Sequence, residues 1–276
     1  MRQAALPSNN RDTTPRRTPE GFYEYDGDKQ FATTLARGLQ LLRCFTPDQP
    51  LQGNKDLAQR LGLPKATISR LTYTLVQLGY LRNDRRLGKY ELAPAVLSLS
   101  YPMLASLTLR QIARPAMKQF SDYAGGSVSL AIRDRLRVVY IETSRSNSIF
   151  SRNLSDIGMS YPIIQTATGH AYLAGCTPTE RQELLNKIKL KQPDLWGMHS
   201  ERLNRSLDMI GRRGFAISLG EARPEIHAVA VPFRRTTAGE LTVINCVMHV
   251  SQLRDGQLEE EIGPRMVSML KSLPTV

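Results

Sequence analysis

The 276-residue sequence has no long hydrophobic run, few cysteines and no catalytic motif. No apolar stretch approaches the roughly 18 residues of a transmembrane helix, so no membrane partner is expected. The start of the chain lacks the apolar core of a signal peptide, which predicts a cytoplasmic protein. Cys44, Cys176 and Cys246 lie far apart and are odd in number, which is typical of reduced core residues.

Residues that enzymes use for catalysis are also sparse. The four histidines do not occur at HxxxH or HExxH spacing, and no cysteine pair has a zinc-ligand interval. No phosphate-binding glycine loop is present, and Glu221 and Glu225 fall in a predicted loop. Because catalysis needs converging groups, we expect no catalytic residue, no metal and no cofactor, and therefore not an enzyme.

Basic residues, in contrast, are abundant. The formal net charge is +12, and residues 1–92 carry half of it in one third of the length. From Lys55 to Lys89, eight basic residues oppose only Asp56 and Asp84, which leaves a local net charge of +6. This density favours a nucleic-acid partner for the N-terminal part.

The same basic segment has the pattern of two short helices joined by a tight turn. Gly62 closes the first helix, and Pro64 stands where a second helix can begin. The second helix is expected to bury four apolar residues: Ile68, Leu71, Leu75 and Leu78. Its other face would enter the major groove of double-stranded DNA. The DNA-reading residues predicted on this face are Thr67, Ser69, Arg70 and Tyr73, with Lys65 on a phosphate.

Residues 81–92 predict two short strands joined by a charged turn, in the manner of a β-wing. Arg85, Arg86 and Lys89 would lie on the phosphate backbone. Helix-turn-helix units also occur in plain helical domains, and a charge run is often only a solvated face. The combination of a helix-turn-helix pattern with an attached basic wing favours DNA binding.

The chain is predicted to have four parts. Residues 1–30 are polar and interrupted by prolines, so we expect a disordered arm that is either a plain tail or an extra DNA contact. Residues 31–92 would form the DNA-binding domain, residues 93–112 a helical linker interrupted at Pro102, and residues 113–276 an effector-binding domain with an antiparallel sheet. Two apolar stripes are expected to be buried: Leu35, Leu39, Leu42 and Phe45 in the opening helix, and Leu97, Leu104, Leu109 and Ile112 in a linker-mediated dimer.

One helix of the C-terminal part is expected to begin at a ligand site. Residues 166–169 open it, and the free N–H groups and dipole of a helix N-terminus favour an anion such as a carboxylate. The same residues are equally typical of an N-cap followed by small packing residues. The effector-binding residues predicted around this site are Tyr161, Ile163, Ala167, Thr168, Glu221, His227 and Asn245. His227 has an alternative interpretation as a core histidine bonded to the backbone.

These patterns resemble the IclR-type (isocitrate lyase regulator) family of bacterial transcription factors over about residues 30–275. LARGLQLLRCF is similar to the opening helix of that family, and DLAQRLGLPKATISRLTYTLVQLGYL to its helix-turn-helix. GMSYPIIQTATGHAYLA and GFAISLGEARPEIHAVAVPF resemble two signatures of its effector domain. The resemblance implies a mixed α/β (α+β) fold with an N-terminal winged helix-turn-helix, a helical linker and a C-terminal GAF-like domain.

The resemblance also implies a function. Such proteins are ligand-responsive transcriptional regulators that bind a pseudo-palindromic operator as a homodimer or homotetramer and sense a small aliphatic or aromatic acid. The alternative is a DNA-binding protein whose C-terminal domain only oligomerises. The chain departs from the family pattern at His170, where Lys or Arg is frequent, and at residues 247–249, where Val-Met-His replaces Ser-Gly-Pro after Asn245. A pocket with convergent polar groups would separate the two functions.

Overall fold

The chain folds into two compact units, residues 1–103 and 104–276, which are described separately. The computed structural model describes residues 22, 25, 27–148, 150, 154–236 and 239–273. The arm predicted for residues 1–30 lies mostly outside the described residues. Within the described ranges, no helix is both long enough and apolar enough to cross a membrane.

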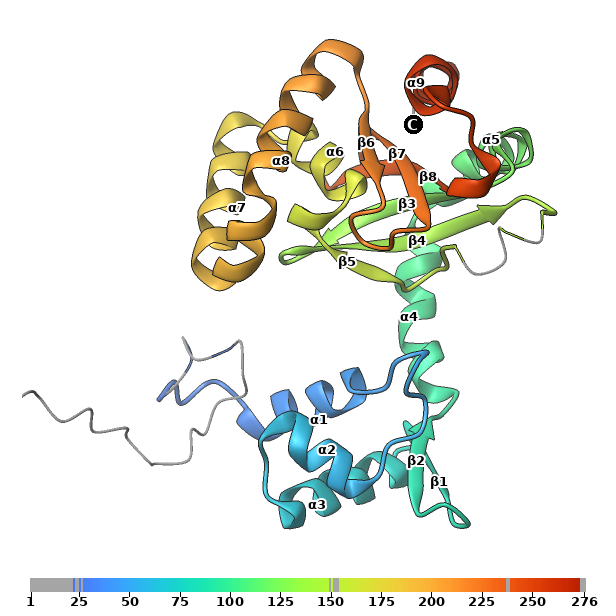
Figure 1. Cartoon of the computed structure of the whole chain (residues 1–276). Coiled ribbons are helices and arrows are strands. Elements are labelled where there is room, and N and C mark those ends of the chain that lie inside the picture. The colour runs from blue at the N-terminus through green and yellow to red at the C-terminus, as the bar shows by residue number, and fades with distance from the viewer. Residues whose placement is uncertain are drawn as a thin grey trace, which may run out of the picture. The chain divides into compact units, whose positions relative to one another are not determined.

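The first unit contains the predicted helix-turn-helix and wing. Its helices are α1 (Thr33–Arg43), α2 (Asn54–Leu61) and α3 (Lys65–Gln77), and its antiparallel hairpin is β1 (Leu81–Asp84) with β2 (Lys89–Leu92) (Figure 1). Gly62 adopts a left-handed backbone at the end of α2, which any side chain with a Cβ would disfavour. One core joins the three helices to β1: Leu41, Phe45, Leu57, Ile68, Leu71, Leu75 and Leu81.

Three leucines that we predicted to be buried are exposed in this unit. Leu35 and Leu39 lie on the outer face of α1, and Leu78 lies beyond the end of α3. An amphipathic helix can turn only one stripe toward its neighbours. In α1 the stripe that faces α3 contains Gly38 and Leu41 instead. The apolar spacing predicted the helix correctly and placed Leu42 and Phe45 against the core, but it was wrong for Leu35 and Leu39.

The second unit is built on a six-stranded antiparallel sheet in the order β5-β4-β3-β8-β7-β6. The strands are β3 (Ser127–Asp134), β4 (Arg137–Arg145), β5 (Ser160–Pro162), β6 (Ala216–Leu219), β7 (Ile226–Arg235) and β8 (Leu241–His249). Helices α5 (Thr108–Ala124) and α9 (Gly263–Ser272) cover one face, and α6 (Ala167–Gly175), α7 (Pro178–Lys191) and α8 (Pro193–Arg213) cover the other (Figure 1). The mixed fold with an antiparallel sheet is therefore confirmed.

Helix α4 (Ala95–Ser106) contains the division between the two units. We predicted an interruption at Pro102, but α4 is continuous through this residue, and Pro115 likewise lies inside α5. None of the residues of α4 is fully buried, and four of its apolar side chains are exposed: Leu97, Leu99, Tyr101 and Met103.

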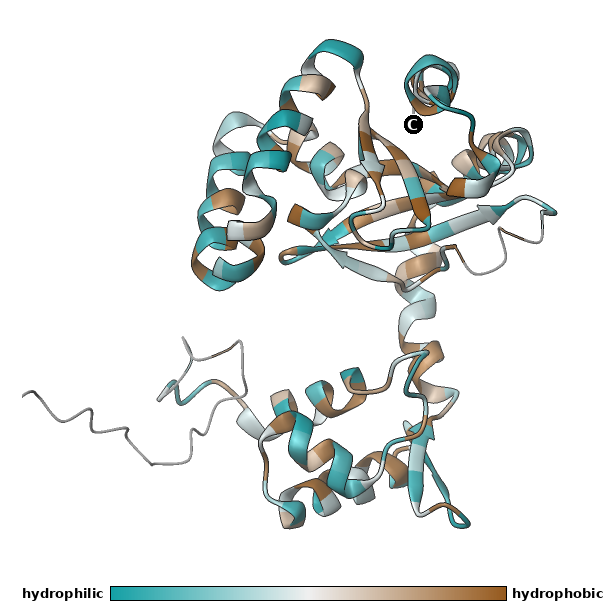
Figure 2. Ribbon diagram, viewed as in Figure 1, coloured by the Kyte–Doolittle hydropathy of each residue, from teal (hydrophilic) through white to brown (hydrophobic). Residues whose placement is uncertain are grey.

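Two hydrophobic cores lie on opposite faces of the sheet. The core beneath α5 and α9 includes Met117, Ile244 and Met266, and the core beneath α6, α7 and α8 includes Leu173, Ile188 and Leu203. Figure 2 shows hydrophobic residues concentrated on the central strands and hydrophilic residues on the outer faces of α7 and α8. The sheet is therefore buried on both faces. This explains why consecutive residues in its strands are apolar instead of alternating between apolar and polar.

A β-bulge reverses the side-chain alternation of β4. Leu130 pairs with Glu142, but Ala131 pairs with Tyr140, so Ile141 is an extra residue. A bulge of this kind re-aims the side chains that follow it. As a result, Ile141 and Glu142 both face α5, whereas Tyr140 packs in the core beneath α6.

Glu142, which follows the bulge, forms a buried ion pair with α5. Its side chain is 5% exposed and accepts from Arg110 at 3.0 Å and from Arg114 at 2.7 Å. Arg110 also donates to the carbonyl oxygen of Leu104 at 2.6 Å. The carboxylate therefore holds the first turns of α5 against the sheet.

Candidate functional site

The outer face of α3 carries the residues predicted to read DNA. Lys65, Ser69, Arg70 and Tyr73 are exposed, and Thr67 is half-buried. The apolar side chains at positions 68, 71 and 75 fill the core on the opposite face. Tyr73 is 66% exposed, so its side chain is accessible to a partner.

Contacts with α2 fix the position of α3. Asn54 Nδ2 donates to Ser69 Oγ at 3.2 Å, and Thr72 Oγ1 donates to Asn54 Oδ1 at 3.5 Å. The side-chain amide of Asn54, at the start of α2, thereby holds α3 at two of its residues. A helix that is fixed in this way can present its side chains to a groove without reorganising.

The wing is held in shape by Asp84. Its Oδ1 accepts from the backbone N–H groups of Arg86 at 2.9 Å and Leu87 at 3.1 Å, and Gly88 closes the turn with φ = 61°. Arg85 and Arg86 are exposed. Asp84 therefore acts as a turn cap and not only as a charge that opposes the basic residues.

A second candidate site is a cavity in the second unit, between α6 and the sheet. It is an open pocket, and about 450 Å³ of space, open solvent included, lies among its lining atoms. Its lining combines aromatic, aliphatic and polar side chains, as ligand pockets do. The lining residues are Tyr140, Leu154, Tyr161, Thr166, Ala167, Thr168, Ser218, Ala222, Arg223, Ile226, Ala228, Asn245 and Val247.

Three buried polar side chains meet in this cavity. Asn245 Nδ2 donates to Tyr140 Oη at 2.8 Å and to Thr168 Oγ1 at 3.0 Å. Burial raises the pKa of Tyr140 to about 12, so its phenol stays neutral in the physiological range. The three residues come from β8, β4 and α6, so this cluster ties the helix to the sheet.

The other polar end of the cavity carries a positive charge. Burial raises the pKa of Tyr161, while the positive charges of Arg223 and Arg137 act in the opposite direction. Arg223 lies on the segment between β6 and β7 and pairs with Glu225 at 2.6 Å. None of the thirteen described residues that line the cavity is acidic. The lining therefore favours an anionic ligand over a cationic one.

Helix α6 points its N-terminus into the cavity. Thr166 is its N-cap, with Oγ1 accepting from the backbone N–H of Gly169 at 3.1 Å. A Cβ at position 169 would lie 1.9 Å from the backbone oxygen of Ile163, so only glycine fits there. The backbone of the first turn, at Ala167 and Thr168, lines the cavity.

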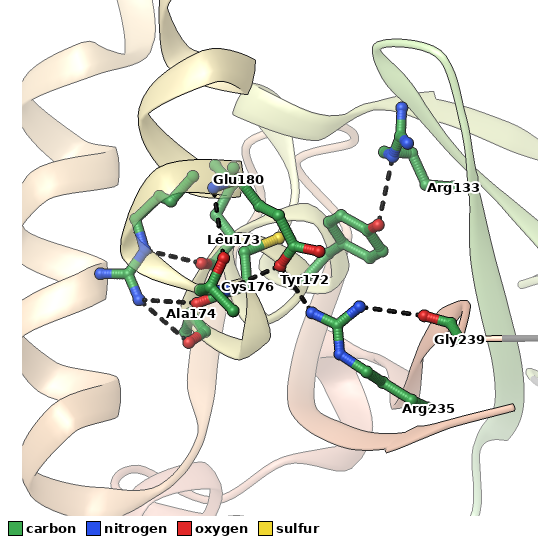
Figure 3. A network of polar contacts seen from close by, with 10 residues as sticks. Arg133, Tyr172, Leu173, Ala174, Cys176, Glu180, Arg235 and Gly239 are labelled. Atoms are coloured by element: carbon green, nitrogen blue, oxygen red, sulfur yellow. Dashed lines mark hydrogen bonds and ion pairs between the residues drawn. The ribbon is translucent and has the colours of Figure 1, made fainter.

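The opposite end of α6 is anchored by arginines. Arg181 donates from Nε to the backbone oxygen of Leu173 at 2.8 Å and from Nη2 to that of Ala174 at 3.1 Å. Such bonds satisfy the last carbonyl groups of a helix. The carboxylate of Glu180, in the first turn of α7, pairs with Arg235 at 2.6 Å (Figure 3).

A further bond connects α6 with the β3–β4 hairpin. Arg133 Nε donates to the phenol oxygen of Tyr172 at 3.1 Å (Figure 3). Burial raises the pKa of Tyr172, which keeps the phenol protonated beside the cation. These contacts fix the axis of α6, and therefore also the place where its N-terminus meets the cavity.

The cavity brings together four of the seven residues predicted for the effector site: Tyr161, Ala167, Thr168 and Asn245. They come from three elements that are far apart in the sequence, namely β5, α6 and β8. The other three predicted residues do not line it.

Each of these three has a different position. Ile163 is fully buried in the core beneath α6. Glu221 forms an ion pair with Arg202 of α8 and accepts from Ser218, so it holds the segment after β6 in place. His227 stands between two cavity residues of β7, and strand alternation turns its side chain to the other face.

Sequence reasoning missed several residues that do line the cavity, among them Tyr140, Ser218 and Arg223. Arg223 could have been predicted from the sequence, because it lies two residues from Glu221 and its positive charge would attract an acid. Tyr140 lies in an apolar run, where only the pairing of β4 and β3 shows which face it occupies.

The described residues contain no group of three or more potential metal ligands. Cys246 is fully buried, and its burial raises the pKa of the thiol to about 12, so the thiol is not a nucleophile.

Known proteins share both units. The family model "IclR helix-turn-helix domain" matches residues 34–85, and the model "Bacterial transcriptional regulator IclR C-terminal" matches residues 102–269. The HTH-type transcriptional regulator TsaQ1/TsaQ2 of Comamonas testosteroni is 32% identical over 241 residues, which are 87% of this chain and 86% of that protein.

Solved structures show the same arrangement of elements. An IclR family transcriptional regulator from Brucella abortus is 40% identical, with a TM-score of 0.76 over 88% of this chain and 92% of its own. An IclR homolog from Microbacterium hydrocarbonoxydans, solved with 4-hydroxybenzoate, is 24% identical, with a TM-score of 0.61 over 87% of this chain and 99% of its own. The chain therefore belongs to the IclR family of bacterial transcriptional regulators.

Proposed function

We propose that this DNA-binding transcriptional regulator responds to a small organic acid that binds in the cavity between α6 and the sheet. The observation that carries the proposal is the cavity itself, which joins a helix N-terminus, buried polar groups and a cationic side chain. A C-terminal unit that served only for oligomerisation would have no need of such a lining. Members of this family are regulators and not enzymes.

The carboxylate would lie at the N-terminus of α6. The backbone N–H groups of Ala167 and Thr168 would be oriented by the helix, and Arg223, which also pairs with Glu225, would add a charged donor. Tyr161 and Ile226 would form the apolar walls against the body of the ligand. The 4-hydroxybenzoate in the homolog from Microbacterium supports an aromatic acid as one member of the ligand class.

The DNA-binding surface would combine the outer face of α3 with the wing. Thr67, Ser69, Arg70 and Tyr73 would approach base edges in the major groove of an operator. Lys65, Arg85, Arg86 and Lys89 would neutralise phosphates, which strengthens binding to any sequence. Such an operator lies on the bacterial chromosome, so the protein would act in the cytoplasm.

Two copies of the chain would bind a pseudo-palindromic site together, as a dimer or within a tetramer. Recognition helices of a dimer read half-sites about 34 Å apart. We propose residues 93–112 as the linker and the exposed apolar side chains of α4 as part of the surface that a second copy covers. The stripe named from the sequence fits less well, because Leu109 belongs to the core of the second unit.

A thermal-shift screen tests the effector. The full-length protein would be heated with a panel of aliphatic and aromatic carboxylates, since a ligand that binds only the native state raises the melting temperature. Hits should bind at least several-fold more weakly to Arg223→Gln and unchanged to the control Arg254→Gln, whose arginine pairs with Glu260 away from the cavity. If no acid shifted the wild-type protein, the effector proposal would have to be abandoned.

A further inference from the structure

Asn54 is the first residue of α2, but its side chain does not serve that helix. An asparagine near the start of a helix commonly acts as its N-cap. Here Gly53 is the N-cap, and Asp56 Oδ2 accepts from the backbone N–H of Gly53 at 2.9 Å. The Asn54 amide is therefore not required to begin α2, and its contacts with α3 call for another explanation.

The two ends of this amide contact two different hydroxyl groups of α3. The oxygen accepts from Thr72 Oγ1 at 3.5 Å, and the nitrogen donates to Ser69 Oγ at 3.2 Å. Thr72 is fully buried, whereas Ser69 is exposed on the face predicted to meet DNA. The contact with the buried threonine thus turns the amide nitrogen toward the exposed serine.

Ser69 differs from two threonines of the same helix in the use of its hydroxyl hydrogen. Serine and threonine side chains in helices can donate to the carbonyl oxygen four residues earlier. Thr72 and Thr74 both do so at 3.0 Å, the former in addition to its contact with Asn54. Within the described residues, the Ser69 oxygen accepts from Asn54 and its hydrogen has no acceptor. This hydroxyl group can therefore donate to a partner outside the protein.

We propose that Asn54 is a positioning residue for DNA recognition, which presents the Ser69 hydroxyl group to a base edge as a hydrogen-bond donor. The inference rests on the proposed DNA-binding surface and adds a residue outside α3 that determines sequence preference. A donor left unpaired in a closed interface is costly, whereas an unused lone pair of an oxygen is tolerated more readily. Ser69 would therefore favour a base that offers an acceptor.

The four bases differ in what they offer to such a donor. In the major groove guanine, adenine and thymine present acceptors, whereas cytosine presents only the donor at N4. Ser69 is the fifth residue of α3, in the N-terminal part of a recognition helix that meets base edges. At the base that Ser69 contacts, cytosine should therefore be rejected.

Selection of random-sequence duplexes by the full-length protein tests the inference. The position read by Ser69 is the one at which Ser69→Ala loses a preference of the wild type. There the wild type should bind a G·C pair about fivefold to tenfold more tightly in one orientation than in the other. Fluorescence anisotropy with duplexes that differ only in this orientation gives the ratio. Thr74→Ala removes a hydroxyl group that is bonded within α3, so this control should keep every preference.

Two substitutions of Asn54 separate positioning from structural support. Asn54→Leu should abolish the orientation ratio at this base pair and leave the other preferences unchanged, and Asn54→Ala replaces it if it does not fold. Asn54→Asp should reverse the ratio, because a carboxylate only accepts, takes the Ser69 hydrogen and leaves the serine as an acceptor for cytosine N4.

An added negative charge lowers affinity for all DNA, so the ratio between duplexes is the quantity compared. Gln59→Glu is the control for this charge, since Gln59 is exposed on the same helix. It should keep the wild-type ratio.

The possible failures are distinct. If Asn54→Leu weakens binding to all duplexes by one factor and keeps the ratio, Asn54 only supports the fold and the inference is overturned. It is also overturned if Asn54→Asp keeps the wild-type ratio, because the serine would then already donate to position 54. If Ser69→Ala loses no preference, the inference fails while the DNA-binding function stands. If the wild-type protein selects no sequence, the inference falls together with the proposed function.

Discussion

The side-chain amide of Asn245 on β8 donates a hydrogen bond of 2.8 Å to the phenol oxygen of Tyr140 on β4, across the intervening strand β3. The two residues are 105 positions apart in the sequence. Their contact holds together the two strands that form the floor of the cavity.

The Tyr140→Phe substitution should destabilise the protein by about 1–2 kcal/mol, because it removes the acceptor for a buried amide hydrogen. The affinity for a bound acid should fall as well, since the amide loses one of its two anchors. Urea denaturation and calorimetric titration measure the two effects. Tyr73→Phe, on the exposed face of α3, is the control and should change neither quantity, since neither measurement involves DNA.

The Glu142→Gln substitution should cost roughly 3 kcal/mol in the free energy of unfolding. It leaves Arg110, with a side chain that is only 14% exposed, without its carboxylate, and breaking a buried ion pair carries this order of penalty. Denaturation by urea at neutral pH gives the value. The ion pair between Arg254 and Glu260 is exposed, so Glu260→Gln should cost less than about 1 kcal/mol. Equal losses in both variants would contradict this account.

His170 should make stability depend on pH. It is 2% exposed, and burial lowers its pKa to about 4, against about 6.5 in the unfolded chain. Between these values the unfolded state binds more protons, so stability falls as pH decreases from about 6.5 to about 4. The loss over this window is on the order of 3 kcal/mol. In His170→Gln, unfolding measured across the same window should show a shallower slope, with the largest difference from wild type near pH 4.

The Arg86→Ala substitution should weaken specific and non-specific DNA binding by similar factors. A phosphate contact carries no sequence information, but it contributes to counterion release. The slope of log affinity against log salt concentration should therefore decrease in magnitude by about one. Fluorescence anisotropy with an operator and a scrambled duplex gives both quantities. A change in sequence preference at an unchanged salt slope would argue against the wing assignment.

The Leu97→Glu substitution should reduce association of the chain. Leu97 is 73% exposed on α4, and a carboxylate there would oppose burial against a second copy. Sedimentation at micromolar concentration should show a dimer or tetramer for the wild type and a smaller species for the variant. Leu190→Glu is the control, because Leu190 is equally exposed but lies on α7. A monomeric wild-type protein would rule out the proposed assembly.

Much of the first unit could be predicted from local signals. Gly62 and Pro64 marked the turn, and the spacing of Ile68 and Leu71 selected the buried face of α3. Leu35 and Leu39 were assigned wrongly because α1 has two apolar stripes. Only the packing against α3 decides between them, and spacing along the sequence does not contain that information.

The candidate site was harder to predict. The N-terminus of α6 has a local signature, and Ala167 and Thr168, which were predicted from it, line the cavity. Whether the His227 side chain faces the cavity depends on the alternation of β7. An error of one residue in that alternation moves a side chain to the opposite face of the sheet. The face of Tyr140 depended on the bulge in the β3–β4 hairpin. A bulge of this kind cannot be inferred from the composition of a single strand.

The bulge in β4 also separates the evolutionary constraints on this strand. Tyr140 serves the ligand cavity, and Glu142, only two positions later, serves the opposite face of the same sheet. In a regular strand these two positions would share a face, and a change at one would disturb the surroundings of the other. Substitution at Tyr140 can therefore alter which ligand is recognised while the attachment of α5 to the sheet is preserved.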